Sequence, residues 1–123
     1  HKLHFLAVTH DAKHGRVLTI MTCPGDWPDA RLQYPLNVPV ELSGDGPIGL
    51  AAEIDGGSLQ FSYRDGGGDW QPVGPVLDAS VISDEGGRGE HGSFTGAFVG
   101  MAAFDTSGRG KAADFDHFVY RPC

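Results

Sequence analysis

Apolar residues recur at every second position along much of the chain, and this period of two predicts β-strands. The pattern is clearest over residues 3–9 and 16–22. The polar segment between them, residues 10–15, has the composition of a turn, so the two strands are expected to form an antiparallel hairpin. Shorter strands are predicted at residues 38–42, 48–54, 59–63 and 70–73, each close to glycine, proline or aspartate residues.

Two further strands are predicted near the C-terminal end. Residues 97–104 (AFVGMAAF) form an uninterrupted apolar run, which is typical of a central strand buried on both faces. Residues 115–121 (FDHFVYR) are expected to form the closing strand. Irregular loops are predicted at Pro24–Pro39, which carries four prolines, and at the glycine-rich Ser83–Ser93. No segment has a convincing helical period.

The composition supports an all-β domain with many turns. Glycine contributes 19 and proline 8 of the 123 residues, about twice the usual share, while 40% of residues are hydrophobic. Eight or so short strands between turn signals are typical of a sandwich or barrel. The net charge of −7 would repel phosphate backbones and anionic lipid, so neither nucleic acid nor a membrane is expected as a partner.

The two cysteines, Cys23 and Cys123, provide neither a disulfide framework nor a zinc site. A bridge between them would close almost the whole chain and contribute about 4–5 kcal/mol. Two free thiols are the simpler interpretation, and no cofactor is expected.

Several carboxylates could serve chemistry or simply accept hydrogen bonds. Asp114 and Asp116 are two apart on a predicted strand, so their side chains would share a face about 6–7 Å apart. That spacing is compatible with an inverting glycosidase pair or, together with Asp105, with calcium binding. Hydrogen bonding at a strand edge is the simpler explanation. Asp65, Asp69 and Asp84 raise the same calcium alternative, but Asp-Gly turns are common without an ion.

Other patterns are weak. Gly87–Gly92 matches the bare G-x-G-x-x-G pattern, but a β-type segment follows where a nucleotide site needs a helix. His10 and His14 flank one turn without a metal-ligand spacing, so a metal site is not predicted. Trp27, Trp70 and Tyr34 could stack on sugar rings or could anchor loops.

Three long stretches carry a resemblance to a known family. They are FLAVTHDAKHGRVLTIMTC (5–23), GGSLQFSYRDGGGDWQPVGPVLDASVISDE (56–85) and GSFTGAFVGMAAFDTSGRGKAADFDHFVYRP (92–122). The chain resembles the C-terminal β-sandwich of glycoside hydrolase family 43 enzymes that act as β-xylosidases and α-L-arabinofuranosidases. F-T-G-A-F-V-G followed by A-D-F-D-x-F is the most specific part.

The resemblance implies a concanavalin-like antiparallel β-sandwich (jelly roll) that is incomplete at its N-terminal side, with residues 1–123 as its C-terminal portion. It implies a catalytic five-bladed β-propeller as partner, whose carboxylates are not in this chain, and a complementary fragment or a second copy to cover the open edge. It also implies a substrate-binding residue, Phe94, delivered by the Ser83–Ser93 loop to a xylo-oligosaccharide. A mobile glycine-rich arm could exclude water in this way.

Three functions therefore remain open. The first is an accessory sandwich of a xylan-degrading exo-glycosidase that stabilises the propeller and shapes its pocket. The second is a stand-alone carbohydrate-binding module for xylan or xylo-oligosaccharides. The third is an interaction domain without a ligand.

Overall fold

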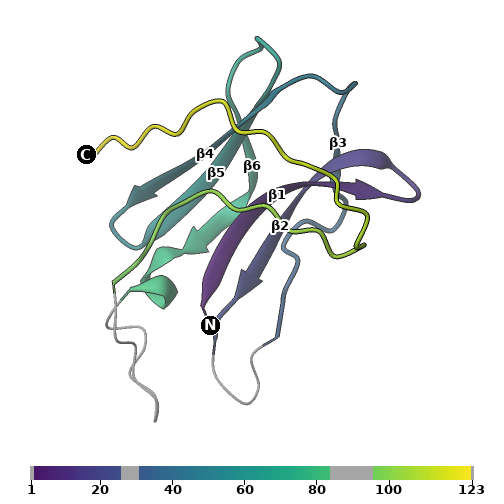
Figure 1. Ribbon diagram of the computed structural model, residues 1–123. Coiled ribbons are helices and arrows are strands. Elements are labelled where there is room, and N and C mark those ends of the chain that lie inside the picture. The colour runs from purple at the N-terminus through teal and green to yellow at the C-terminus, as the bar shows by residue number, and fades with distance from the viewer. Residues whose placement is uncertain (1, 26–30, 84–95, 123) are drawn as a thin grey trace.

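The computed structural model describes residues 2–25, 31–83 and 96–122 and shows two antiparallel sheets packed face to face (Figure 1). The first sheet has the order β1-β2-β3, and the second has the order β4-β5-β6. Their bounds are β1 Leu3–Asp11, β2 Gly15–Cys23, β3 Val40–Glu41, β4 Ile48–Asp55, β5 Ser58–Asp65 and β6 Gln71–Asp78. The predicted all-β sandwich class is confirmed, as is the first hairpin, in which Leu3 pairs with Cys23 and Asp11 with Gly15.

The core lies between the two sheets. Leu18 and Ile20 of β2 are fully buried and pack in one cluster with Leu59 and Phe61 of β5 and Val73 of β6. These residues alternate along their strands, as expected for side chains that share one face. The inter-sheet contact is close at Gly74 of β6, where an added Cβ would collide with the Cδ1 atom of Ile20.

The short helix η1, Ala79–Ile82, follows β6 directly. Asp78 caps it by accepting hydrogen bonds from the backbone N–H and the hydroxyl of Ser80, at 2.9 and 2.6 Å. Ala79 is buried, and its backbone N–H donates to Gly57 O at 2.8 Å. Within the described ranges, no helix has the length and apolar character needed to cross a membrane.

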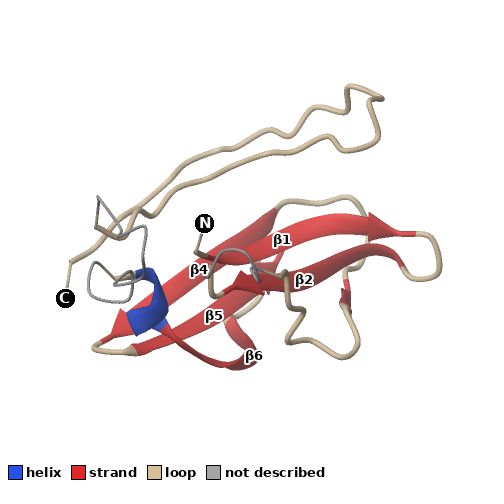
Figure 2. Cartoon of the chain, turned by 90° about the horizontal axis from the view of Figure 1, so that it is seen from below, coloured by secondary structure: helices blue, strands red, loops and turns tan. Residues whose placement is uncertain are grey.

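The two strands predicted at 97–104 and 115–121 are not formed. Residues 96–122 run out and back as an extended layer on one side of the two sheets (Figure 2), with no strand pairing and with their residues exposed. Phe98 is 84% exposed and Phe104 75% exposed. The prediction of a central buried strand is wrong here because a strand needs a hydrogen-bonded neighbour and a covering sheet, and the described chain supplies neither.

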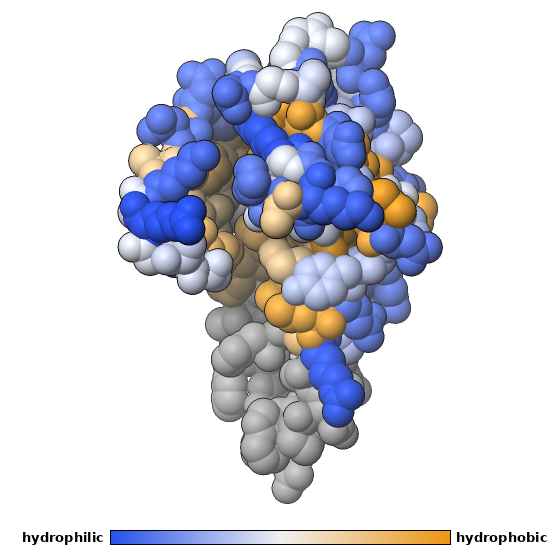
Figure 3. All heavy atoms as spheres, turned by 90° about the vertical axis from the view of Figure 1, so that its right-hand side faces the viewer, coloured by the Kyte–Doolittle hydropathy of each residue, from blue (hydrophilic) through white to orange (hydrophobic). Residues whose placement is uncertain are grey.

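Much of the inner face of β4 is also uncovered. Leu50 and Ile54 pair with Tyr63 and Leu59 of β5 and therefore point toward the same side as the core. Yet Leu50 is 43% exposed and Ile54 44% exposed, whereas Leu59 is buried. The first sheet is thus too narrow to cover all of the second. In the space-filling view, a hollow with apolar residues at its floor opens on the side that faces the viewer (Figure 3).

Candidate functional site

The predicted substrate-binding residue, Phe94, lies outside the described residues, as do residues 84–93 of its loop and the G-x-G-x-x-G pattern. The structure does describe the root from which that loop departs. This root consists of the end of β6, η1 and Ser83, whose backbone N–H and hydroxyl both donate to Ser80 O, at 3.1 and 2.6 Å.

The loop root is tied to both sheets. The Nε2 atom of His4 on β1 lies 2.9 Å from Asp78 O, and Ala79 is bonded to Gly57 in the turn between β4 and β5. Because a carbonyl only accepts, His4 carries its proton on Nε2. Its Nδ1 atom is then a buried acceptor without a partner in the described structure.

Hydrogen bonding also lowers the pKa of the capping carboxylate, Asp78. The Ser80 hydroxyl and then the Ser80 backbone N–H hold the pKa of Asp78 below its usual value. The carboxylate is therefore fully ionised at neutral pH and keeps its capping role there. The segment leading to Phe94 thus starts from a fixed point. The Asp-x-Ser spacing of residues 78–80 is the sequence signal that could have identified it.

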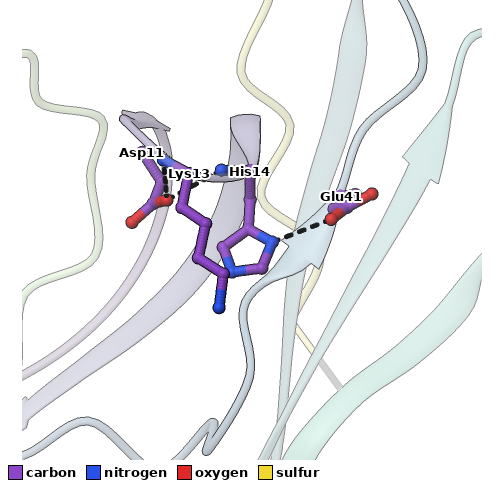
Figure 4. A network of polar contacts seen from close by, with 4 residues as sticks. All are labelled: Asp11, Lys13, His14 and Glu41. Atoms are coloured by element: carbon purple, nitrogen blue, oxygen red, sulfur yellow. Dashed lines mark hydrogen bonds and ion pairs between the residues drawn. The ribbon is translucent and has the colours of Figure 1, made fainter.

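The turn of the first hairpin is organised by Asp11 (Figure 4). Its Oδ1 atom accepts hydrogen bonds from the backbone N–H groups of Lys13 and His14, at 2.7 and 2.8 Å. These bonds, that of His14 first, lower the pKa of Asp11. The Nδ1 atom of His14 lies 2.8 Å from Glu41 Oε1 and ties the hairpin to β3.

His10 and His14 do not share a site, although they flank one turn. His14 pairs with Glu41, whereas His10 lines a cavity together with Ser107, Arg109 and Lys111. Among the described residues, no group of three or more histidine, cysteine or acidic side chains is placed to hold a metal ion.

The candidate carboxylates lie in separate places. Asp65 accepts hydrogen bonds from the backbone N–H and hydroxyl of Ser43, at 3.2 and 2.8 Å. Asp116 contacts the neighbouring His117 at 3.1 Å and, like Asp114, is exposed on the extended layer. The predicted shared strand face of these two residues is not formed, because residues 115–121 are not a strand.

Asp105 is used by its own loop. Its carboxylate accepts from the backbone N–H and hydroxyl of Ser107 and from the N–H groups of Gly108 and Gly110. The Ser107 hydroxyl, followed by the backbone N–H of Gly110, lowers the pKa of Asp105. The Asp105 oxygens that a calcium site would use as ligands therefore accept hydrogen bonds within the loop. Asp84 lies outside the described residues.

The aromatic candidates differ in their surroundings. Trp70 lies just before β6 and is 48% exposed; the Arg64 guanidinium sits 4.9 Å from the centroid of its ring. The indole packs over Gly49, where an added Cβ would come within 3.0 Å of it. Tyr34 is exposed on the loop before β3. Trp27 lies outside the described residues, and so does Cys123, while Cys23 is buried.

The sequence of this chain is similar to those of known proteins. Residues 1–121 match the family described as the beta xylosidase C-terminal concanavalin A-like domain of GH43 proteins. The chain belongs to this family. This chain is 47% identical over 119 residues to xylosidase/arabinosidase 43B of Humicola insolens, a match that covers 96% of this chain. No solved structure matches it.

Two further relatives are also named as xylosidases. The domain is 34% identical over 116 residues to a beta-xylosidase of Bacillus subtilis and 33% identical over 118 residues to a xylan 1,3-beta-xylosidase of a Vibrio species. The matches cover 94% and 95% of this chain but only 21% of each relative, as against 22% of the Humicola protein. The chain thus spans about a fifth of the length of these curated relatives, as an accessory domain of longer proteins does.

Proposed function

We propose that this chain is the C-terminal portion of an accessory β-sandwich in a xylan-degrading glycosidase, where it stabilises the catalytic domain and helps to close the substrate pocket. The reaction of the whole polypeptide would be inverting hydrolysis of a terminal β-xylosyl or α-arabinofuranosyl bond. Carboxylates outside this chain would carry it out. The support is membership of the GH43 family together with relatives named as xylosidases that are about five times as long.

One structural observation carries the proposal: large apolar residues are exposed where a complete sandwich would bury them. They are Phe98, Val99, Met101, Phe104, Phe115, Phe118, Val119 and Tyr120 of the extended layer, and Leu50 and Ile54 of β4. Monomeric soluble domains seldom expose so many large apolar side chains, and backbone without ladder partners adds to the cost. Strands from the rest of the polypeptide would pair with residues 97–104 and 115–121 and cover β4.

Completion by another part of the polypeptide has a direct test. Size-exclusion chromatography with light scattering of the isolated chain should show self-association, because the uncovered surface would be buried against a second copy. A 13.0 kDa monomer that melts cooperatively would contradict the proposed incompleteness.

The pocket-closing role is assigned to Phe94. The support is the firm root of its loop, in which Asp78, Ser80 and His4 fix the point of departure. An aromatic side chain delivered from such a root could cover one face of a pentose ring and exclude water from the bond being broken.

Kinetics of the full-length polypeptide tests this role. Phe94→Ala should lower kcat/KM for an aryl xyloside at least tenfold, whereas Phe94→Leu, which retains apolar bulk, should lose much less. Leu32→Ala, at an exposed apolar residue of another loop, is the matched control. Unchanged kcat/KM in Phe94→Ala would remove Phe94 from the pocket. Turnover of an aryl xyloside by the isolated chain would show that catalytic groups lie within it.

A second candidate function is carbohydrate binding without catalysis, and Trp70 is the observation that favours it. About half of this indole is exposed, and the adjacent Arg64 could donate hydrogen bonds to sugar hydroxyls. Stacking of a sugar ring on an aromatic face is a common basis of such binding.

Calorimetric titration of the isolated chain with xylohexaose separates the two functions. A binding module should release or absorb heat, and Trp70→Ala should abolish it. An accessory sandwich that acts only through the catalytic domain should give no heat with either protein.

A further inference from the structure

The two edges of the second sheet differ in their capacity to accept another strand. In the order β4-β5-β6, the outer strands are β4 and β6. β6 contains Pro72 and Pro75, which have no backbone N–H, and its register with β5 is interrupted between Leu59 and Phe61. Prolines and bulges are usual at sheet edges because they hinder pairing with a further strand. β6 therefore has the features of a strand that stays at the edge.

β4 has none of these features over most of its length. Its residues pair with β5 in an unbroken register, from Ile48 opposite Asp65 to Asp55 opposite Ser58. It contains no proline, and its first part, IGLAA, carries no charge. Among the described residues, no strand pairs with its other side. A regular, uncharged edge of this kind presents alternate N–H and C=O groups to any strand that lies beside it.

The side chains of β4 are incomplete on the same side. Leu50 and Ile54 share the core face of the sheet with β5 but are 43% and 44% exposed, whereas Leu59 and Phe61 of β5 are buried. A strand on the free side of β4 would lie about 5 Å away, so every second side chain would pack beside Leu50 and Ile54. β4 also lies nearer than β6 to the extended layer (Figure 2), whose residues 96–122 have no strand pairing either.

We propose that the free edge of β4 binds a β-strand from the part of the full-length polypeptide outside residues 1–123, while β6 remains the outer strand on the opposite side. This inference rests on the proposed function, in which a longer polypeptide completes the sandwich. The relatives have ample further chain, since the matches cover only 22% and 21% of them. Backbone hydrogen bonds would hold the strand, and apolar residues at every second position, facing Leu50 and Ile54, would fix its register.

Hydrogen exchange of the full-length polypeptide, followed by mass spectrometry, tests the inference. A strand with one neighbour directs only alternate N–H groups to it, so about half of the β4 amides would be protected if β4 were an edge. With a strand on both sides, nearly all amides of Ile48–Asp55 should exchange roughly a hundredfold more slowly than in an unfolded peptide. β6 is the internal control and should show protection of about half of its amides at most. Protection of only half of the β4 amides would overturn the inference.

Two neighbouring substitutions test the hydrogen bonds on each side of β4. The N–H groups of Ala51 and Ala52 point in opposite directions, so that one faces β5 and the other faces the free edge. If a strand occupies that edge, Ala51→Pro and Ala52→Pro each remove a ladder hydrogen bond, and both should accelerate exchange of β5 to a similar extent. If one of them is tolerated, as Pro72 and Pro75 are in β6, then β4 is an edge strand and the inference fails.

Dilution and activity separate the remaining alternatives. Protection of β4 that is lost on dilution, as light scattering shows dimers dissociating, would assign the edge to a second copy and refute the chosen occupant. Hydrolysis of an aryl xyloside is measured on the same sample. Hydrolysis with a half-protected β4 would leave the proposed function standing and remove the added strand. Full protection of β4 without hydrolysis would support the added strand and count against the proposed function.

Discussion

Gly74 is the position at which the face-to-face packing of the two sheets can be tested most sharply. Its φ is 72°, and a Cβ placed on it would overlap Ile20 Cδ1 and lie 3.4 Å from Leu36 Cδ2. Gly74→Ala therefore adds two costs. An L-residue in the left-handed region costs about 1–2 kcal/mol. Forcing a methyl group against the fully buried Ile20 costs about 1–3 kcal/mol more.

A control and a compensating change separate these two costs. Gly56 also has a positive φ, of 55°, but nothing lies within 4 Å of an added Cβ, so Gly56→Ala should cost only the backbone share. Ile20→Val removes the δ-methyl group that the new methyl group at position 74 would strike, and alone it costs about 0.5–1.5 kcal/mol. The double variant Gly74→Ala/Ile20→Val should therefore be more stable than the sum of the single effects predicts.

Hydrogen exchange followed by mass spectrometry is the assay, because it reports this domain separately within the full-length polypeptide. A loss of about 3 kcal/mol should accelerate exchange of the protected amides of β2 and β5 roughly a hundredfold. Equal effects of Gly74→Ala and Gly56→Ala, with no rescue by Ile20→Val, would refute the contact between β6 and β2 and, with it, the packing of the sheets.

Two further predictions concern the loops. Asp78→Ala removes the cap of η1, at a cost of about 1 kcal/mol, and should speed exchange within Ala79–Ile82 several-fold while Asp55→Ala, at an exposed aspartate at the end of β4, leaves it unchanged. The pKa values of Asp11 and Asp105 are lowered by hydrogen bonds in the folded state, so the stability they add is present above the unfolded value of about 4 and is lost as the pH falls through the lower folded values. Exchange near residues 11–14 and 105–110 should accelerate over that acidic range in the wild type, and Asp105→Asn should remove the acid-dependent change in the second loop only.

The local pattern of the sequence was sufficient to predict the paired strands. The alternation over 3–9 and 16–22, and the turn chemistry between them, predicted an antiparallel hairpin that the structure confirms. The short edge strand predicted at 38–42 is present as Val40–Glu41. Hairpins can be predicted in this way because both partners and the turn lie within a few residues of one another.

The apolar run at 97–104 shows why the rest could not be predicted. Its composition indicates a segment made to be buried, but composition does not say which strands will bury it. A strand requires partners, and in the described chain these residues have none. The apolar pattern therefore identified residues that are suited to burial, but in the structure these residues are exposed and form no strand.

The candidate site was predictable only in part. The Asp-x-Ser cap at 78–80 has a recognisable signal, whereas the group formed by His10, Arg109 and Lys111 joins residues about a hundred positions apart. Nothing in a local pattern places such residues together. Phe94 was predicted from the family resemblance and stays a prediction, because it lies outside the described residues.

On the proposed function, other strands of a longer polypeptide complete this chain. Hydrogen exchange of residues 97–104 and 115–121 tests it most directly, compared between the isolated 123-residue chain at low concentration and the full-length polypeptide. We expect fast exchange in the isolated chain and strong protection in the full-length polypeptide, since ladder partners would then satisfy the amides. Equally fast exchange in both would contradict the claim and leave the extended layer as the native state of these residues.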